Sequence, residues 1–526
     1  MTAVLAPAAT GTGAAVGAWR RLFLRCLLVP LTVTAPLTYL ALGFDHRYNV
    51  YWHGAVVQAR PWSLVTENLR TVPMYLDFGN FRPLGRMLEW SVDVLAYLLT
   101  GLLQLPAQVG LRLMSALAAA VLTAAAVLLA EAVTARGRMF GAPPARPLVV
   151  VPFALGASLA AAGQLSSTVL FGGLYFLSAA IVLAVAAWLA RAPRSMPLVV
   201  VAGAALATVN EMAALALPVA TVAVLARARL GPAALPNPAS AGPAGPARPL
   251  RAVVALWAGF LPVFVPVRIL IWAACRDGDC YRNSDLLLGS GLGSALPHRL
   301  VAWLPPLQWD EALREAAAPG RVVLAAAVLA LAALAVRPLA DLARLPSLGR
   351  RPAIALALTG AAVLLLGAGL GSVNRQGQLM ASMDRWGAGW RDSGLTAAGG
   401  ALLLTGLLAL AARAVVLRTA LVVVALGAAV STAVNHAYAQ AANRRPAALV
   451  SAAISAEIAQ FDTTAAGDRR RCELRDRFAA LFADDAYSRF AAGELPGTRS
   501  AADRMQVTAD LATRQRYGRP FCRGAE

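Results

Sequence analysis

Long apolar runs separated by short polar segments recur along almost the whole chain. The first covers about residues 22–44 and follows Trp19, Arg20 and Arg21. A helix that crosses a membrane needs about 20 apolar residues, so the pattern predicts about 11 transmembrane spans. No small-residue cleavage site closely follows the first run, which predicts a retained anchor. The later runs lie at about 107–133, 147–163, 168–189, 197–209, 212–225, 252–273, 322–336, 353–370, 395–412 and 420–434.

Two apolar stretches are ambiguous, and the distribution of arginine decides how we interpret them. Basic residues near span ends mark the cytoplasmic side of a membrane. With the N-terminus inside, every inside loop is basic only if residues 197–225 form two short spans that turn at Asn210–Glu211. The same condition requires that residues 84–105 do not cross. We therefore expect 84–105 to be an amphipathic helix on the outer face.

The predicted fold class is all-α, a polytopic membrane protein with its N-terminus inside and its C-terminus outside. A transmembrane domain at 1–435 precedes a small helical extracytoplasmic domain at 436–526. A Pro-, Gly- and Ala-rich linker lies in the cytoplasmic connection 227–251 and carries no expected chemistry. The large outer loops are expected at 45–106, with in-plane helices, at 274–320 and at 372–393.

The composition narrows the class of protein further. Hydrophobic residues make up 59% of the chain, charged residues 14%, and the mean hydropathy is +0.62, which excludes a soluble enzyme and a disordered protein. The formal net charge is +20, and all 47 basic residues are arginine. Because most of the surplus falls in the predicted cytoplasmic loops, the charge reports topology and gives no support to nucleic acid as a partner.

Five cysteines are present, and four of them fall in predicted outer segments. Cys26 lies inside the first span. Cysteines on the oxidising side of a membrane commonly pair. We therefore predict two disulfides, Cys275–Cys280 and Cys472–Cys522, with free or metal-binding thiols as the alternative.

An acidic residue stands directly after the first span. Asp45, between Phe44 and His46, is placed at the outer membrane surface, where a carboxylate can act as a general base on a hydroxyl. An ordinary solvated loop residue is the alternative. Other candidate acids are Asp77, Glu67 and Glu211.

Several arginines are placed to bind a phosphate at the same face. Arg82 and Arg86 are four residues apart, so they can present two guanidinium groups to one anion. Anchoring to phospholipid head groups is the alternative. Further candidates for the same role are Arg268, Arg375, Arg385 and Arg391.

A divalent metal such as Mg or Mn is a further candidate cofactor. Asp277 and Asp279 form an Asp-x-Asp motif, which can hold a metal and a diphosphate. His46 is another candidate ligand. Because Asp-Gly is also a common turn, an ordinary loop is the alternative.

The chain resembles the C-type (GT-C) integral-membrane glycosyltransferases, which include oligosaccharyltransferases, protein O-mannosyltransferases and aminoarabinose transferases. The resemblance rests on Asp45 and Tyr48 after the first span, on the segment Phe81–Leu84 (Phe-Arg-Pro-Leu), and on the overall plan. It implies a polyprenyl-phosphate sugar donor, a cell-envelope glycan, lipid or protein acceptor, and a site outside the bacterial cytoplasmic membrane. It also implies inversion at the sugar, with Asp45 as the base and arginines on the donor phosphate. Many relatives have Asp-Glu where this chain has Asp45-His46.

Other classes of membrane protein fit parts of the pattern. A glycan polymerase or ligase would also have many spans and arginine-rich outer loops. A lipid or glycan flippase should show repeated halves and polar midplane residues, whereas here the polar residues gather at one face. A non-catalytic envelope assembly protein would tolerate loss of Asp45.

Overall fold

Nearly all of the described chain is helical. The computed structural model has 79% helix and, in the part that it describes, no strand beyond one isolated bridge between Leu286 and Asn374. The all-α prediction is therefore confirmed. The described residues are 11–43, 46–135, 139–191, 193, 195–231, 247–277, 286–289, 291–314, 316–411, 413–482 and 501–523.

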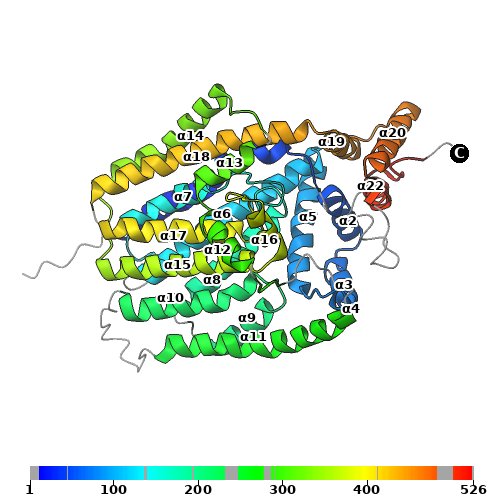
Figure 1. The fold of residues 1–526 in the computed structure, drawn as a ribbon. Coiled ribbons are helices and arrows are strands. Elements are labelled where there is room, and N and C mark those ends of the chain that lie inside the picture. The colour runs from blue at the N-terminus through cyan, green and yellow to red at the C-terminus, as the bar shows by residue number, and fades with distance from the viewer. Residues whose placement is uncertain are drawn as a thin grey trace, which may run out of the picture.

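Among the described residues, nine helices are long and apolar enough to cross a membrane. They lie side by side in a bundle (Figure 1). Their shared core is made largely of Ala, Val and Leu, which lets the helices approach closely. The nine are α1 (Gly11–Thr34), α6 (Ala107–Thr134), α8 (Gly172–Ala190), α10 (Ala216–Leu230), α11 (Ala247–Ala274), α14 (Arg321–Asp341), α15 (Arg350–Ser372), α17 (Ser393–Ala411) and α18 (Ala414–Asn443).

Two of the predicted spans are short helices. The run at 147–163 is helical only through η2 (Arg146–Val150) and α7 (Val151–Ala157), and the run at 197–209 is helical only as α9 (Met196–Leu206). Both fall below the length that defines a candidate span. In each segment the helix is shorter than the apolar run, because it stops and a buried or turning backbone follows.

The backbone after α7 is buried without being helical. Asn435 of α18 supplies its partners: the side-chain oxygen accepts from the Ala161 N–H at 2.7 Å, and the amide donates to the Leu159 carbonyl at 3.1 Å and to the Val33 carbonyl at 2.9 Å. Ser431 donates to the Ala157 carbonyl at 2.6 Å. Irregular backbone inside a membrane protein requires such protein partners, because lipid offers none.

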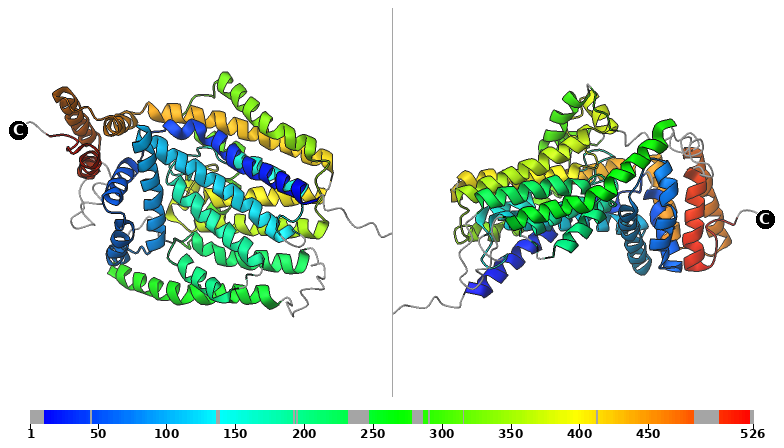
Figure 2. Two further views of the ribbon diagram at one scale, coloured as in Figure 1. Left: turned by 180° about the vertical axis from the view of Figure 1, so that it is seen from behind. Right: turned by 90° about the horizontal axis from the view of Figure 1, so that it is seen from below.

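The bundle has two different ends. At one, the Trp19 indole donates to the Ala142 carbonyl at 2.8 Å and the Arg146 N–H donates to the Pro346 carbonyl at 2.9 Å. We call this the linker end. The other, which we call the loop end, carries the short helices of the long loops (Figure 2). These are α2 (His46–Ala59), α3 (Ser63–Arg70), α4 (Val72–Asp77), η5 (Cys275–Asp277), α12 (Leu292–Val301), α13 (Pro305–Leu313) and α16 (Arg375–Ser382).

Helix α5 (Pro83–Leu103) runs across the loop end, at a steep angle to the spans (Figure 1). It is not among the candidate spans, although it is long enough. One of its faces is buried and includes Trp90, Ala96 and Tyr97, while Leu95, Leu98 and Leu102 are exposed. An amphipathic helix of this kind suits a membrane surface.

The C-terminal helices begin later than the sequence suggested. Helix α18 continues through residue 436 to Asn443, so the boundary placed at 435/436 falls inside a helix. Helices α19 (Pro446–Ala459), α20 (Ala465–Phe482) and α22 (Ala501–Tyr517) follow. α22 packs against α2, and both contribute to one apolar cluster. The predicted disulfide Cys472–Cys522 is present. It joins α20 to the segment that follows α22, across a sequence separation of 50 residues.

Candidate functional site

The start of α5 is fixed to the turn that follows α9. The N–H groups of Leu84 and Gly85 both donate to the Thr208 carbonyl, at 3.0 and 3.3 Å. A Cβ atom at Gly85 would lie 1.8 Å from the Val209 carbonyl oxygen, so only glycine permits this approach. Pro83 begins the helix, where its missing N–H is harmless.

The turn itself is held by Asn210. Its amide donates to the Ser178 hydroxyl at 2.7 Å, and its side-chain oxygen accepts from the N–H of Ala213, the first residue of the short helix η3 (Ala213–Leu215), at 2.9 Å. The predicted turn at Asn210–Glu211 is therefore found. It places Glu211 beside the start of α5.

Three arginines from three different segments lie close enough to Glu211 to act on it electrostatically. Arg268 of α11 has its Nη2 3.9 Å from the Glu211 Oε1, and both side chains are about two-fifths exposed, at 41% and 44%. Arg82, Arg391 and Arg268 all act electrostatically on Glu211. Arg82 and Glu89 also act on Arg86. We call this set the arginine cluster: Arg82, Arg86, Arg268, Arg391, Glu89 and Glu211.

The charges of the arginine cluster do not balance. Four guanidinium groups face two carboxylates, which leaves a surplus of two positive charges. Burial raises the pKa of Glu211, but the positive charges of Arg82, Arg391 and Arg268 outweigh it, so the pKa is lowered overall. Burial likewise lowers the pKa of Arg82, and the neighbouring acid Glu89 reverses this. The pKa shifts of Glu211 and Arg82 thus both favour the charged form, and the surplus positive charge attracts an anion.

Aromatic rings support the guanidinium groups. The Arg86 guanidinium carbon lies 3.0 Å from the centre of the Tyr75 ring, and that of Arg391 lies 5.7 Å from the centre of Tyr175. The Nε atoms of Arg82 and Arg86 are buried and have no hydrogen-bond partner within the described residues. Unpaired buried donors are costly, so this arrangement suits an acceptor-rich group such as a phosphate.

Two of the predicted phosphate-binding arginines lie elsewhere. Arg385 forms an ion pair with Glu311, a buried acid on α13 that also lies 3.2 Å from Arg314. Arg375 is exposed at the first position of α16. Neither residue appears among the charges that act on Glu211. The structure therefore brings together four of the six arginines.

The predicted acids are placed differently from one another. Glu67 pairs with Arg70 on the surface of α3, with 2.7 Å between the charged atoms. Asp77 ends α4 and is exposed. Asp45, the predicted base, lies outside the described residues. Glu211 is the only one of these four that the described structure places in the arginine cluster.

The predicted metal ligands are not available for comparison, because Asp279 and the side chains of Asp277 and His46 lie outside what the structure describes. Within the described residues, no three His, Cys, Asp or Glu side chains group together as metal ligands. Cys275 is disulfide-bonded, while its predicted partner Cys280 lies outside the described residues.

A buried ion pair at the loop end was not anticipated from the sequence. Arg299 of α12 contacts both carboxylate oxygens of Asp392, one at 3.2 Å, and also donates to the Ala388 carbonyl. Both side chains are almost completely buried, at 3% and 1% exposed. We call this pair the closed pair. Arg299 and Asp392 are 93 positions apart, so no local sequence pattern predicts that they pair.

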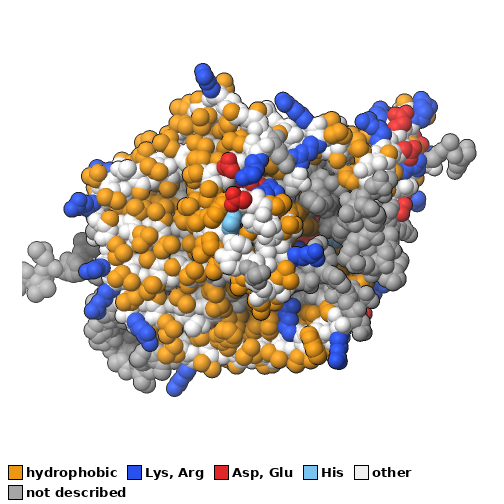
Figure 3. All heavy atoms as spheres, viewed as in Figure 1, with side chains coloured by type: hydrophobic (Ala, Val, Ile, Leu, Met, Phe, Trp, Pro, Cys, Tyr) orange, Lys and Arg blue, Asp and Glu red, His pale blue; other side chains and the backbone are white. Residues whose placement is uncertain are grey.

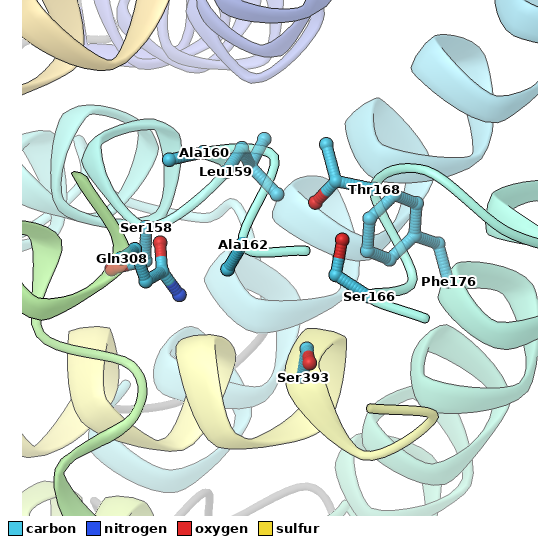
Figure 4. A pocket seen from close by; sticks show the side chains of 9 residues that line it. All are labelled: Ser158, Leu159, Ala160, Ala162, Ser166, Thr168, Phe176, Gln308 and Ser393. Carbon is cyan, nitrogen blue, oxygen red and sulfur yellow. The ribbon is translucent and has the colours of Figure 1, made fainter. Parts of the chain in front are cut away.

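A small pocket opens between the irregular segment after α7, helix α13 and the start of α17 (Figure 4). Its lining contains hydroxyl and amide groups but no acid or base. Gln308 presents a buried side-chain oxygen that has no partner in the described structure. This chemistry distinguishes the pocket from the arginine cluster. The lining residues are Ser158, Leu159, Ala160, Ala162, Ser166, Thr168, Phe176, Gln308 and Ser393.

Comparison with protein-family models, with curated proteins and with solved structures gives no match for this chain. The resemblance to GT-C glycosyltransferases therefore rests on the residues and plan described above.

Proposed function

We propose that the protein is a membrane glycosyltransferase that moves a sugar from a polyprenyl-phosphate donor to a cell-envelope acceptor. The observation that carries this proposal is the arginine cluster, with its surplus positive charge and unpaired buried donors at one end of an apolar helix bundle. A polyprenyl phosphate is an anion on a lipid anchor, so it can reach this end of the helix bundle from the membrane. The acceptor would be a glycan, a lipid or a protein.

The path of the chain supports a site on one side of the bilayer. Residue 146 contacts Pro346 at the linker end, while Ala162 accepts from the Gly389 N–H at the loop end, at 2.7 Å. Thr208 likewise contacts the start of α5. On this reading the segments of α7 and α9 complete two further traverses, which makes eleven with the nine long helices.

The charge of the two ends supports the orientation with the loop end outside the cytoplasm. In the described chain, the linker end carries many arginines but only Glu131 and Asp341 as acids, and cytoplasmic loops are basic. The bacterial cytoplasmic membrane fits this plan. The arginines are Arg20, Arg21, Arg25, Arg146, Arg191, Arg227, Arg229, Arg251, Arg337, Arg344, Arg350, Arg351, Arg413 and Arg418.

The proposed reaction divides the work between two sets of residues. Arg82, Arg86, Arg268 and Arg391 bind the donor phosphate and stabilise the negative charge that grows on it as the sugar leaves. Asp45 accepts the proton of the acceptor hydroxyl as that oxygen attacks the anomeric carbon. Attack opposite the leaving phosphate inverts the sugar configuration.

A transfer assay on purified protein in lipid nanodiscs tests the proposal. Polyprenyl-phosphate hexoses and pentoses serve as donors, with an envelope extract as acceptor. We expect Arg82→Gln to lower the transfer rate by about 100-fold, since removing one group that stabilises a developing anion has this order of effect. Arg375→Gln is the matched control and should retain wild-type transfer. Equal rates in both variants would contradict the role of the cluster.

The alternatives give different results in the same assay. Asp45→Asn should abolish transfer while leaving donor binding intact. Transfer that survives this change would remove Asp45 as the base. Binding of the polyprenyl phosphate without turnover of any donor would favour a polymerase, a ligase or a flippase. A reporter fused after Glu526 must report an extracytoplasmic position, and a cytoplasmic signal would overturn the orientation.

A further inference from the structure

A second basic group lies at the linker end, at the opposite end of the bundle from the arginine cluster. Figure 3 shows basic side chains along this end, and no acidic side chain is visible there among the atoms drawn in colour. Between α1 and α14, which pack against each other, arginines of both helices meet. None of these arginines takes part in the proposed transfer.

Arg25 is anchored between the two helices. Its Nε donates to the Leu334 carbonyl of α14 at 3.1 Å, and its Nη1 donates to the Arg21 carbonyl of its own helix at 3.3 Å. The Leu334 carbonyl is available because the residue four positions later is Pro338, which has no N–H to donate to it. The sequence of α14 thus creates the acceptor that holds this guanidinium, and the position of Arg25 does not depend on a ligand.

Further guanidinium groups lie along the same two helix faces. Arg21 and Arg25 are four residues apart on α1, and Arg337 follows Leu334 by three residues on α14, so each pair shares a helix face. Arg21 and Arg337 both act electrostatically on Arg25. A Cβ atom at Gly17 would lie 3.5 Å from the Arg21 Nη1, so the Arg21 side chain reaches back toward the start of α1.

The charges of this group do not balance. Asp341 is the acid that acts on Arg25, and its carboxylate lies 3.7 Å from Arg344. Four guanidinium groups therefore face one carboxylate, which leaves a surplus of three positive charges. In the part of the chain that the structure describes, Arg21, Arg25 and Arg337 form no ion pair with an acid. Because these groups repel one another, an anion placed among them would be attracted strongly.

The surroundings of the group suit the acyl chains of a lipid. Leu24 and Leu27, on either side of Arg25 in α1, are 50% and 38% exposed, and Val336 of α14 is 63% exposed. Apolar side chains that are exposed on membrane-spanning helices contact lipid. The group therefore lies where the head groups and the acyl chains of a bilayer meet. A phospholipid can use both the charges and the apolar surface, whereas a soluble anion can use the charges alone.

The arrangement of the arginines favours a head group with two phosphates. Arg21 and Arg25 lie on α1, while Arg337 and Arg344 lie on α14 and directly after it. Each side of the helix contact can therefore receive one phosphate. Basic pockets between helices at the cytoplasmic side of membrane proteins bind cardiolipin head groups, which have two phosphates, and the proposed orientation places the linker end on that side.

We propose that the contact between α1 and α14 at the linker end is a binding site for diphosphatidylglycerol (cardiolipin). Arg21, Arg25, Arg337 and Arg344 bind its two phosphates, and Arg25 contributes N–H groups that its two backbone bonds leave free. The lipid bridges α1 and α14 and so stabilises their contact. The site is independent of the proposed transfer reaction.

Native mass spectrometry of the delipidated full chain in detergent, titrated with cardiolipin, tests the site. We expect one cardiolipin per chain to bind more than about five-fold more tightly than phosphatidylglycerol. Arg25→Gln and Arg337→Gln should each weaken cardiolipin binding by about five-fold, the scale of one arginine at an anionic membrane surface. Arg229→Gln, which removes an exposed arginine of α10 at the same end, is the matched control and should bind as the wild type does.

Arg25→Gln also removes the hydrogen bond to Leu334, so thermal unfolding without lipid shows whether this variant is folded. Arg337 is exposed and makes no hydrogen bond with the described residues, so Arg337→Gln tests the charge alone. Equal affinity for cardiolipin and phosphatidylglycerol would overturn the proposal. Equal cardiolipin binding by the wild type and both site variants would also overturn it, as would displacement of cardiolipin by an equal concentration of inorganic diphosphate.

Discussion

Arg391 and Asp392 are neighbours in the sequence but belong to two contrasting regions of the loop end. Asp392 is half of the closed pair, where Arg299 satisfies both carboxylate oxygens and water is excluded. Arg391 faces the arginine cluster, which is part-exposed and has a charge surplus. The closed pair is complete without a ligand, whereas the cluster is not.

The carboxylates in these regions respond to burial in opposite directions. Burial raises the pKa of Asp392 in spite of the adjacent Arg299 guanidinium. Glu211 is also partly shielded from water, yet its surrounding arginines lower its pKa. One adjacent guanidinium does not offset the desolvation of Asp392, whereas the several arginines around Glu211 do offset the desolvation of that carboxylate. The same residue types thus serve structure in one place and ligand attraction in the other.

The largest expected effect tests the closed pair. Arg299→Leu leaves Asp392 buried without a partner, and we expect the free energy of unfolding to fall by about 3–5 kcal/mol. Thermal and denaturant unfolding in detergent measure the loss. Arg391→Gln, which changes the residue next to Asp392, should alter the free energy of unfolding by less than about 1 kcal/mol. Equal losses in the two variants would remove the distinction between the regions.

Asn435, like the closed pair, is a buried and hydrogen-bonded polar group, but it carries no charge. Asn435→Leu keeps the side-chain size but leaves the Ala161 N–H and the Leu159 carbonyl without partners. We expect a loss of about 2–4 kcal/mol in the free energy of unfolding, since each buried unsatisfied group costs about 1–3 kcal/mol. The part-exposed Asn443 gives the comparison: Asn443→Leu should cost less. An Asn435→Leu protein as stable as wild type would show that the segment finds other partners.

Loss of an acidic side chain from the arginine cluster should strengthen anion binding, whereas loss of a partner from the closed pair weakens the fold. Glu211→Gln increases the positive surplus, so we expect tighter binding of a fluorescent polyprenyl phosphate, by about five-fold, from about 1 kcal/mol of removed repulsion. Glu67→Gln, which removes an exposed acid of α3, should leave the affinity unchanged. Weaker binding by Glu211→Gln would instead make this acid a direct contact of the ligand.

The smallest effect is a pH dependence. Because the pKa of Glu211 is lowered in the folded state, its ion pairs stabilise the protein above the carboxyl's unfolded pKa, about 4.3. This stability is lost as pH falls through the lower, folded value. The thermal unfolding temperature of Glu211→Gln should therefore lie below that of the wild type at pH 7, and the two temperatures should converge in acid. A constant difference across the pH range would contradict the assignment.

Parts of the fold could be predicted because they depend on local sequence. The apolar runs coincide with all nine candidate spans of the described chain, and residues 84–105, expected not to cross, form helix α5, which is not one of those nine. The Asn210–Glu211 turn and the Cys472–Cys522 disulfide were also found at the expected residues. The early end of α7 has no local signal in the sequence, because its run is apolar throughout and the residues that satisfy the backbone there, Asn435 and Ser431, lie on α18.

The candidate site could be predicted only in part. Six arginines of the predicted outer face were proposed to bind a phosphate, and the structure brings four of them together. Of the other two, Arg385 pairs with Glu311, and Arg375 is exposed at the start of α16. His298 and Asp384 are 86 positions apart in the sequence, so no local pattern predicts that their side chains lie 3.5 Å apart.

The sequence by itself determined that this is an arginine-rich, helical membrane protein with basic loops at one end and long loops at the other. Those features follow from transfer of apolar side chains into lipid, which depends on each segment alone. The tertiary structure decided which charges neutralise one another and which leave a surplus of positive charge. That outcome depends on which helices are neighbours, because electrostatic and hydrogen-bond energies are set by distances of a few ångströms between residues far apart in the chain.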